Sequence, residues 1–183
     1  MELNNIVNFR KGINRILISE EEIADAVKKA GQLISSWYTG KPLLLVSVLK
    51  GSFVFLGDIA RAVDVPCQID FMAAKSYYES TQSSGVVTIT MDLSQDIKGC
   101  DVVIVEDIID TGRTLRDVMK LLRNREPASL RVVTLLDKPD RRIVDLKADH
   151  ALFTIPDLFV IGYGLDYGEY YRNLPYIAEY KEG

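Results

Sequence analysis

The chain has 183 residues, of which 48% are hydrophobic and 26% are charged. These values are ordinary for one globular domain, and they argue against disordered and fibrous proteins. The formal net charge of -4 gives no general attraction to nucleic acid or to an anionic membrane, so neither partner is expected. No stretch reaches the roughly 20 apolar residues of a membrane span. The polar segment from Met1 to Lys11 does not suit secretion, which predicts a cytoplasmic location.

The first third of the chain alternates helical and strand patterns. Ser19 and Glu22 form a capping box before a helix whose apolar residues recur at helical spacing up to Gly40. Residues 43–49 are almost continuously apolar and end in a turn at 50–52, which is typical of a buried parallel strand. Further predicted elements are a helix over 53–63 and a strand over 67–74.

Residues 75–85 form a polar stretch that contains two tyrosines and ends in glycine. Loops of this length inside a compact domain are often functional lids, so a long loop that acts as a lid is predicted. Residues 86–91 mix β-formers with threonine, and they are predicted to form the arm of a β-hairpin.

The second half continues the alternation, and its strongest strand pattern lies at 102–105. Further predicted elements are a helix over 115–123, a strand over 130–136 and a last core strand over 159–163. The pattern predicts one α/β domain over 1–183, with a mostly parallel central sheet flanked by helices. The tyrosine-rich end of the chain, roughly 150–183, is expected to join the N-terminal segment in a small subdomain.

The segment that follows the predicted strand at 102–105 contains the residues that point to a function. It reads Glu106-Asp107-Ile108-Ile109-Asp110-Thr111-Gly112-Arg113-Thr114, and it joins the carboxyl end of a strand, where open parallel sheets bind ligands, to the start of a helix. Glycine lets the backbone approach a ligand, threonine hydroxyls donate to phosphate oxygens, and the first turn of a helix presents free amides. The adjacent acids Glu106 and Asp107 would repel a phosphate group unless a cation or hydroxyl donors offset their negative charge. A ribose 5-phosphate ligand with magnesium supplies both hydroxyl groups and a cation.

The stretch from Val102 to Leu115, which contains this segment, resembles the phosphoribosyl-pyrophosphate signature of the type I phosphoribosyltransferases, and more narrowly that of their hypoxanthine-guanine branch. The resemblance covers most of the chain, from the turn at Leu49-Lys50-Gly51 through Arg172. It implies transfer of the phosphoribosyl group from phosphoribosyl pyrophosphate to a 6-oxopurine base, hypoxanthine or guanine, with Mg2+ as cofactor. It also implies a small hood over the base, a β-arm lid and a homodimer or homotetramer.

Residue roles follow from the same resemblance. Glu106 and Asp107 would hold the ribose hydroxyls, directly or through magnesium. Asp110 would be the catalytic residue that faces N7 of the purine, and residues 111–114 would bind the 5-phosphate. The pyrophosphate would be contacted by Leu49, Lys50, Gly51 and Arg172, with the Leu49–Lys50 peptide in the cis form.

The resemblance also assigns the purine side. Lys138 would donate to the exocyclic O6, Phe159 would stack on the base, and Val160 would meet its edge through the backbone. Asp166 would lie beside the purine and help hold a second magnesium ion. The lid would begin at Ser76 and Tyr77.

Plainer interpretations stay open for several of these residues. Asp110 also suits the N-cap of the following helix. Lys138 could be an exposed residue at a strand end, and Phe159 could belong to the core. Asp166 and Arg172 could form a surface ion pair.

Two other functions stay open as well. One is a non-catalytic regulator on the same fold that binds RNA or DNA. Such a protein is expected to show a basic face and often to lack the base-position aspartate, whereas this chain is acidic and keeps Asp110. The other is a related enzyme for xanthine, adenine or a pyrimidine. Lys138 disfavours adenine, because the adenine amino group would face the donor of the lysine.

Overall fold

The computed structural model describes residues 12–76 and 87–181, which contain a six-stranded sheet and a separate three-stranded sheet. The larger sheet consists of β2 (Leu43–Leu49), β3 (Cys67–Ser76), β4 (Val87–Met91), β5 (Asp101–Ile109), β6 (Ser129–Asp137) and β7 (His150–Thr154). Its strands lie in the order β4-β3-β2-β5-β6-β7, and all neighbours are parallel except the β3–β4 pair. The predicted α/β fold with a mostly parallel sheet is confirmed.

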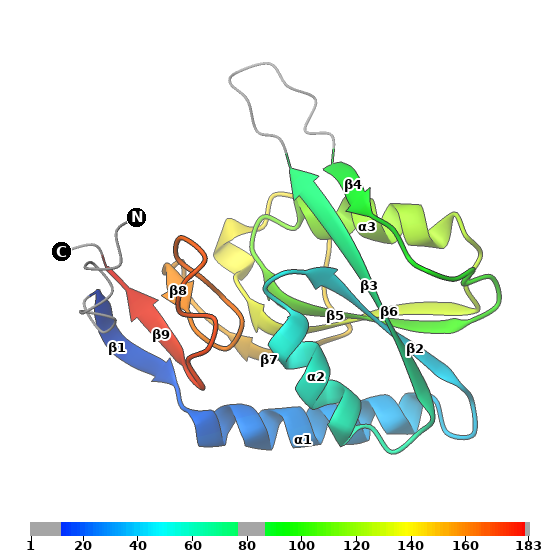
Figure 1. Cartoon of the computed structure of the whole chain (residues 1–183), viewed down its shortest axis with the longest axis horizontal. Helices are drawn as coiled ribbons and strands as arrows, with labels where there is room; N and C mark the ends of the chain where they lie inside the picture. Colours follow the sequence, from blue (N-terminus) through cyan, green and yellow to red (C-terminus); the bar gives the residue numbers. More distant parts are fainter. Residues whose placement is uncertain (1–11, 77–86, 182–183) are drawn as a thin grey trace.

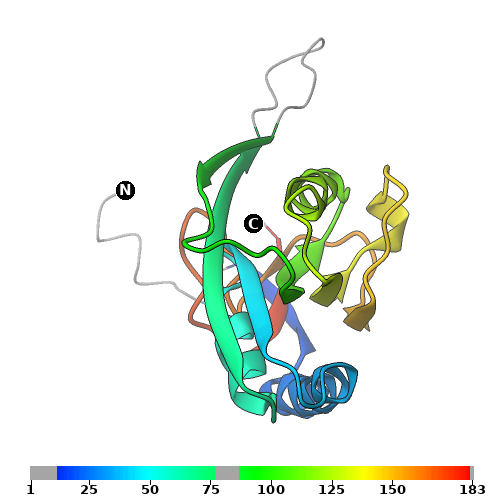
Figure 2. The same cartoon turned by 90° about the vertical axis from the view of Figure 1, so that its right-hand side faces the viewer.

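Three helices cover the two faces of this sheet. They are α1 (Glu20–Trp37), α2 (Phe53–Ala62) and α3 (Arg113–Arg123). Figure 2 shows α3 on one side of the sheet and α1 and α2 on the other. The capping box of α1 is confirmed, because Glu22 N donates to Ser19 Oγ at 3.2 Å and Ser19 N donates to the Glu22 carboxylate at 2.8 Å.

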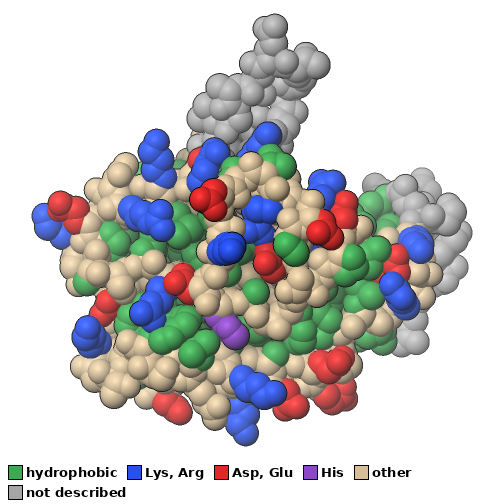
Figure 3. Space-filling view, turned by 180° about the vertical axis from the view of Figure 1, so that it is seen from behind, with side chains coloured by type: hydrophobic (Ala, Val, Ile, Leu, Met, Phe, Trp, Pro, Cys, Tyr) green, Lys and Arg blue, Asp and Glu red, His purple; other side chains and the backbone are tan. Residues whose placement is uncertain are grey.

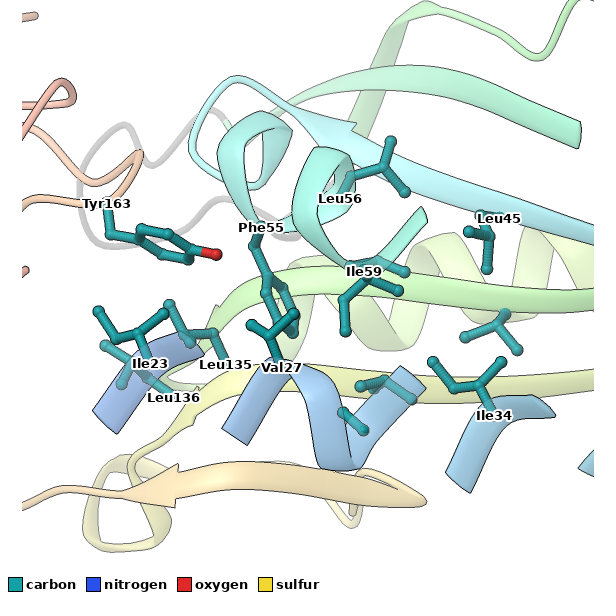
Figure 4. Packing of buried hydrophobic residues seen from close by; sticks show 14 of the residues in the cluster. Ile23, Val27, Ile34, Leu45, Phe55, Leu56, Ile59, Leu135, Leu136 and Tyr163 are labelled. Atoms are coloured by element: carbon teal, nitrogen blue, oxygen red, sulfur yellow. The ribbon is translucent and has the colours of Figure 1, made fainter. Parts of the chain in front are cut away.

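The core lies on both faces of the central strands. Along β2, Leu43 and Leu45 belong to the cluster beneath α1 and α2, whereas Leu44 and Val46 belong to the cluster beneath α3. Because both faces are covered, the strand is apolar at almost every position rather than at alternate ones. In the first cluster, side chains of α1, α2, β2 and β6 meet around Phe55 (Figure 4).

The smaller sheet joins the two ends of the chain. It consists of β1 (Ile13–Ile18), β8 (Val160–Ile161) and β9 (Ile177–Tyr180), antiparallel in the order β1-β9-β8. Figure 1 places it next to the end of the larger sheet where β2 and β7 terminate. Tyr163, just after β8, points its ring toward Phe55 of α2, and its hydroxyl donates to Asp58 at 2.5 Å. This contact fixes the segment after β8 to the main core.

The predicted last core strand over 159–163 is present as the shorter, buried β8, but it does not join the larger sheet. Val160 pairs with Glu179 of β9, so β8 belongs to the smaller sheet. The place at the edge of the larger sheet is taken by β7, which was not predicted. As an edge strand it is only half-buried and lacks the continuous apolar run of the central strands. Because β7 lies in the larger sheet, the smaller sheet draws its C-terminal strands from residue 160 onward.

Several boundaries differ from the predictions. β3 runs to Ser76, so the start of the predicted loop is strand, and it pairs with β4 in the predicted hairpin. The rest of that loop, including Tyr77, lies outside the described residues. β5 continues through the acid pair because it pairs with β6 as far as Ile109 and Asp137. Within the described part of the chain, no helix is both long and apolar enough to cross a membrane.

Candidate functional site

A cleft of about 250 Å³ opens at the carboxyl ends of the parallel strands. It is lined by the end of β2, by Ala74 of β3, by residues 106–112, and by Thr114 and Leu115 at the start of α3. The register of β5 between β2 and β6 brings the predicted motif to this edge. The structure therefore gathers the acid pair, Asp110 and most of the predicted phosphate loop in one cavity.

The acid pair is enclosed within this cleft. The backbone amide of Ile108 donates to Asp107 Oδ1 at 2.8 Å, whereas Glu106 Oε2 is buried without a hydrogen-bond partner. Burial, followed by the charge of Asp107, raises the pKa of Glu106 well above its usual range. Burial also raises the pKa of Asp107 to about 6. An enclosed carboxylate oxygen without a partner fits a cation or a hydroxyl donor of a ligand.

Gly112, within the predicted phosphate loop at 111–114, has a φ of 80° and is the N-cap of α3. Asp110 is therefore not the N-cap, and the amide of Arg113 donates instead to the Thr111 hydroxyl at 3.5 Å. A Cβ at position 112 would press on Arg142 and Val144, so both the left-handed backbone and the close packing require glycine there. Thr114 and Leu115, in the first turn of α3, line the cleft, and the backbone amides of such a turn suit an anion.

Asp110 lies between the loop and the cleft with 40% of its side chain exposed. Arg141 Nε donates to Asp110 Oδ1 at 3.1 Å, and Arg142 Nε donates to the carbonyl oxygen of Asp110 at 3.0 Å. Sequence reasoning missed both arginines. The only signal was two adjacent cations after a strand, a pattern that is common on solvated surfaces.

The predicted pyrophosphate residues also come together. The Leu49–Lys50 peptide is cis, as the resemblance implied, and the following turn is held by hydrogen bonds of the buried Ser52 hydroxyl to Ser47 and Val48. A Cβ on Gly51 would overlap the Asp107 carboxylate, so this turn touches the acid pair.

A charged cluster stands beside that turn. Arg172, with 18% of its side chain exposed, donates to the Gly164 carbonyl oxygen at 2.8 Å and pairs with Asp166 at 2.9 Å. Glu169 accepts from Lys50 at 3.1 Å and from Arg172 at 3.2 Å. Asp166 and Arg172 therefore do form an ion pair, but one next to the cleft. Glu169 was not predicted, because it reaches these cations only through the fold.

The cleft fits a magnesium ion that is shared with a ligand. Among the residues that the structure describes, no group of three or more His, Cys, Asp or Glu side chains could hold a metal ion. Glu106 and Asp107 supply two carboxylates, and magnesium in enzymes typically takes one or two carboxylates and completes its shell with phosphate oxygens and water.

The predicted purine residues lie at the junction of the two sheets. Lys138 is buried, and its ammonium group donates to the carbonyl oxygen of Leu158 at 2.6 Å, so it is not an exposed residue at a strand end. Phe159 is 53% exposed, which excludes a place in the core. Its ring meets Tyr167 and Tyr180 edge to face, with centroids 5.8 and 6.0 Å apart. These tyrosines, which sequence reasoning missed, leave an exposed aromatic surface of the kind on which a base can stack.

Comparison with known proteins agrees with this geometry. A family model described as the phosphoribosyl transferase domain matches residues 12–168. The chain belongs to the phosphoribosyltransferase family. Its relatives include proteins named hypoxanthine-guanine phosphoribosyltransferase from Streptococcus pneumoniae, 49% identical over 93% of this chain and 94% of that protein, and from Lactococcus lactis, 47% identical over 95% and 94%.

Solved phosphoribosyltransferase structures share the fold closely. A hypoxanthine phosphoribosyltransferase from Staphylococcus aureus superposes with a TM-score of 0.91 at 45% identity, covering 98% of this chain and 97% of that one. A hypoxanthine-guanine phosphoribosyltransferase from Bacillus anthracis gives 0.89 at 43%, covering 92% and 99%. The predicted family, fold class and enzyme class are confirmed.

The acid pair of this phosphoribosyltransferase is expected to destabilise the ligand-free protein at neutral and alkaline pH. Asp107 has a pKa of about 6 in the folded chain against an ordinary 3.8, so the folded state binds more protons between these values. Stability therefore falls as pH rises from about 4 to above 6, by at most about 3 kcal/mol for a shift of about two units. Asp107→Asn is expected to raise the melting temperature at pH 8 and to change it little at pH 4.

Thermal melts of the ligand-free protein at the two pH values check this expectation. Asp25→Asn, at an exposed position of α1, is the matched control and is expected to change neither melting temperature by more than a degree or so. An equal gain from Asp107→Asn at pH 4 and pH 8 would contradict the raised pKa.

Proposed function

We propose that the protein transfers the 5-phosphoribosyl group from phosphoribosyl pyrophosphate to N9 of hypoxanthine or guanine, in purine salvage, and releases IMP or GMP with pyrophosphate. The observation that carries the choice of base is the buried ammonium group of Lys138, which donates to the carbonyl oxygen of Leu158, the residue before the exposed Phe159. The names of relatives at 47–49% identity agree with it.

On the donor side, Glu106 and Asp107 accept hydrogen bonds from the ribose hydroxyls. The partnerless Glu106 Oε2 supports this role, because a hydroxyl group of the ligand would satisfy it. The amides of residues 111–114 bind the 5-phosphate at the start of α3. Bound Mg2+ would offset the negative charge of the pyrophosphate, with Glu106 and Asp107, and Asp166 at a second site, as protein ligands.

Pyrophosphate leaves with a large negative charge, which needs stabilisation as it develops. Backbone amides of the turn at 49–51 and the guanidinium of Arg172 supply donors that are already in place. Asp166 and the Gly164 carbonyl oxygen hold Arg172, which supports a fixed orientation for this cation.

On the purine side, Phe159 stacks on the ring and the backbone of Val160 meets its edge. Lys138 donates to O6. Adenine has an amino group at that position, so its binding would set a donor against the buried donor of Lys138. Asp110 accepts the N7 proton while N9 attacks the sugar carbon with inversion. We further propose that the smaller sheet forms the hood over the base, because it carries Val160 and borders Phe159.

The regulator alternative finds little support on the face of the molecule that Figure 3 shows. The face in Figure 3 carries cations and acids side by side rather than a block of one sign, and nucleic acid attracts proteins chiefly through basic patches. Asp110, which a regulator would not need, lines the cleft.

An ultraviolet assay of the purified protein with phosphoribosyl pyrophosphate and magnesium tests the proposal. Hypoxanthine, guanine, xanthine and adenine are offered separately. We expect turnover of hypoxanthine or guanine that stops when EDTA removes the metal. Activity on adenine alone would overturn the role of Lys138, and donor binding without turnover of any base would favour the regulator. The cytoplasmic location and the homodimer or homotetramer stay predictions, which cell fractionation and light scattering would test.

A further inference from the structure

Two consecutive arginines hold Asp110 from two directions. Arg141 ends a short 3-10 helix at Pro139–Arg141, directly after Lys138, and Arg142 follows it. Arg142 binds mainly to the backbone. It donates to the carbonyl oxygens of Asp110 at 3.0 Å and Ile109 at 3.1 Å. It also donates to the carbonyl oxygen of Leu146 at 2.6 Å and pairs with the Asp137 carboxylate. With 13% of its side chain exposed, Arg142 fixes the path of the loop.

Arg141 instead donates hydrogen bonds to two carboxylate side chains. Its Nε donates to Asp110 Oδ1 at 3.1 Å, and its Nη1 donates to Asp157 Oδ2 at 3.4 Å. The other oxygen of Asp157 lies 3.9 Å from the ammonium nitrogen of Lys138. A row of alternating charges therefore runs from Asp110, which lines the cleft, through Arg141 and Asp157 to the buried Lys138.

We propose that Arg141 is a positioning residue, which orients the Asp110 carboxylate toward the purine and, through Asp157, ties it to Lys138. This inference rests on the proposed function, in which Asp110 and Lys138 contact the base. None of the predicted roles included Arg141 or Asp157. Arg141 contacts Asp110 and Asp157, and Asp157 lies beside Lys138, so in this proposal each of them acts through another residue.

The row of charges from Asp110 to Lys138 is not explained by a contribution to the folding stability of the protein. The side chain of Arg141 is 47% exposed, and ion pairs at such positions contribute little to folding. The row is better explained by the fixed geometry that an arginine imposes on the carboxylates it binds. A guanidinium is a rigid planar fork that can hold two carboxylates at a fixed separation, whereas a lysine ammonium is a point charge on a flexible stem. A general base must stay within hydrogen-bond reach of its proton, and small displacements cost rate.

Arg141→Gln is expected to lower kcat about tenfold, because Asp110 loses its fixed orientation, while KM for phosphoribosyl pyrophosphate stays within about twofold. Arg141→Lys should recover part of the loss, since it keeps the charge but not the fork. Asp157→Asn should give a smaller loss in the same direction, and the double variant should lose less than the product of the two, because both act in one network. The matched control is Arg61→Gln, which breaks another exposed Arg–Asp pair, on α2, and should keep wild-type kinetics.

A second readout does not depend on turnover. In wild-type protein the 13C signal of the Asp110 side chain should be sharp, and in Arg141→Gln it should broaden or shift as the carboxylate samples several rotamers. An unchanged signal would overturn the proposal, and so would wild-type kcat in Arg141→Gln or equal losses in the Gln and Lys variants. If the wild-type protein turns over no base, the proposed function fails, and the Asp110 signal alone decides whether Arg141 positions this carboxylate.

Discussion

Asp110→Asn is expected to lower kcat by about 10²- to 10⁴-fold, the usual contribution of a positioned general base, while binding of phosphoribosyl pyrophosphate stays nearly unchanged. The amide keeps the size of the side chain and still accepts a hydrogen bond from Arg141, so the loop retains its anchors. Arg142 holds the backbone of the loop independently of the Asp110 side chain. What the amide lacks is the ability to take a proton from N7.

Steady-state kinetics together with calorimetric titration of the donor separate these two quantities. Asp140→Asn, at an exposed position in the adjacent 3-10 helix, is the matched control and should leave kcat as it is. Wild-type turnover in Asp110→Asn would remove the base role. Equal losses of kcat and of donor affinity would instead assign Asp110 to donor binding.

The contiguous part of the site was predictable from the sequence. The acid pair, Asp110 and the loop at 111–114 occupy nine successive positions, and a strand followed by a helix fixes where such a segment lies in a parallel sheet. The buried strands were predictable for a similar reason. Along residues 43–46 of β2 and 102–105 of β5, the side chains enter the two cores in alternation, and such a continuous apolar run predicts a strand buried on both faces.

The parts of the site that long-range contacts assemble were not predictable in the same way. Arg141 reaches Asp110 across 31 positions, and Glu169 reaches Lys50 across 119. The residues next to an exposed arginine or glutamate in the sequence do not indicate which distant side chain it will contact. The place of the strand over 159–163 was not predictable for a related reason. A short apolar run does not tell which sheet a strand joins, and only the pairing of Val160 with Glu179 decides it.

Gly51 marks the closest approach between the pyrophosphate turn and the acid pair. A Cβ at this position would overlap the Asp107 carboxylate, and a Cβ on Gly164 would in turn overlap the Gly51 carbonyl oxygen. Three segments that are far apart in the sequence thus meet here: Gly164 packs on the backbone of Gly51, and Gly51 packs on the side chain of Asp107. The glycine is needed for space, because any side chain would have to displace the very carboxylate that the proposed function assigns to the ribose and the metal.

Gly51→Ala is therefore expected to lower kcat/KM for the donor by more than about 100-fold, since the Asp107 carboxylate must move. It should also cost about 1–3 kcal/mol of stability through overpacking. Gly57→Ala is the matched control, because a Cβ there meets nothing within 4 Å. Inside α2 it should keep full activity and add up to about 1 kcal/mol of stability.

Combining Gly51→Ala with Asp107→Ala separates the steric effect from other causes. Truncation of Asp107 removes the atoms that the new methyl group would strike, so the stability cost of Gly51→Ala should largely vanish in that background. Activity should not return, because the carboxylate itself is gone. If Gly51→Ala costs the same stability with and without the Asp107 carboxylate, the contact between the turn and the acid pair is not what requires glycine, and the packing of Gly164 on the Gly51 carbonyl becomes the cause to test.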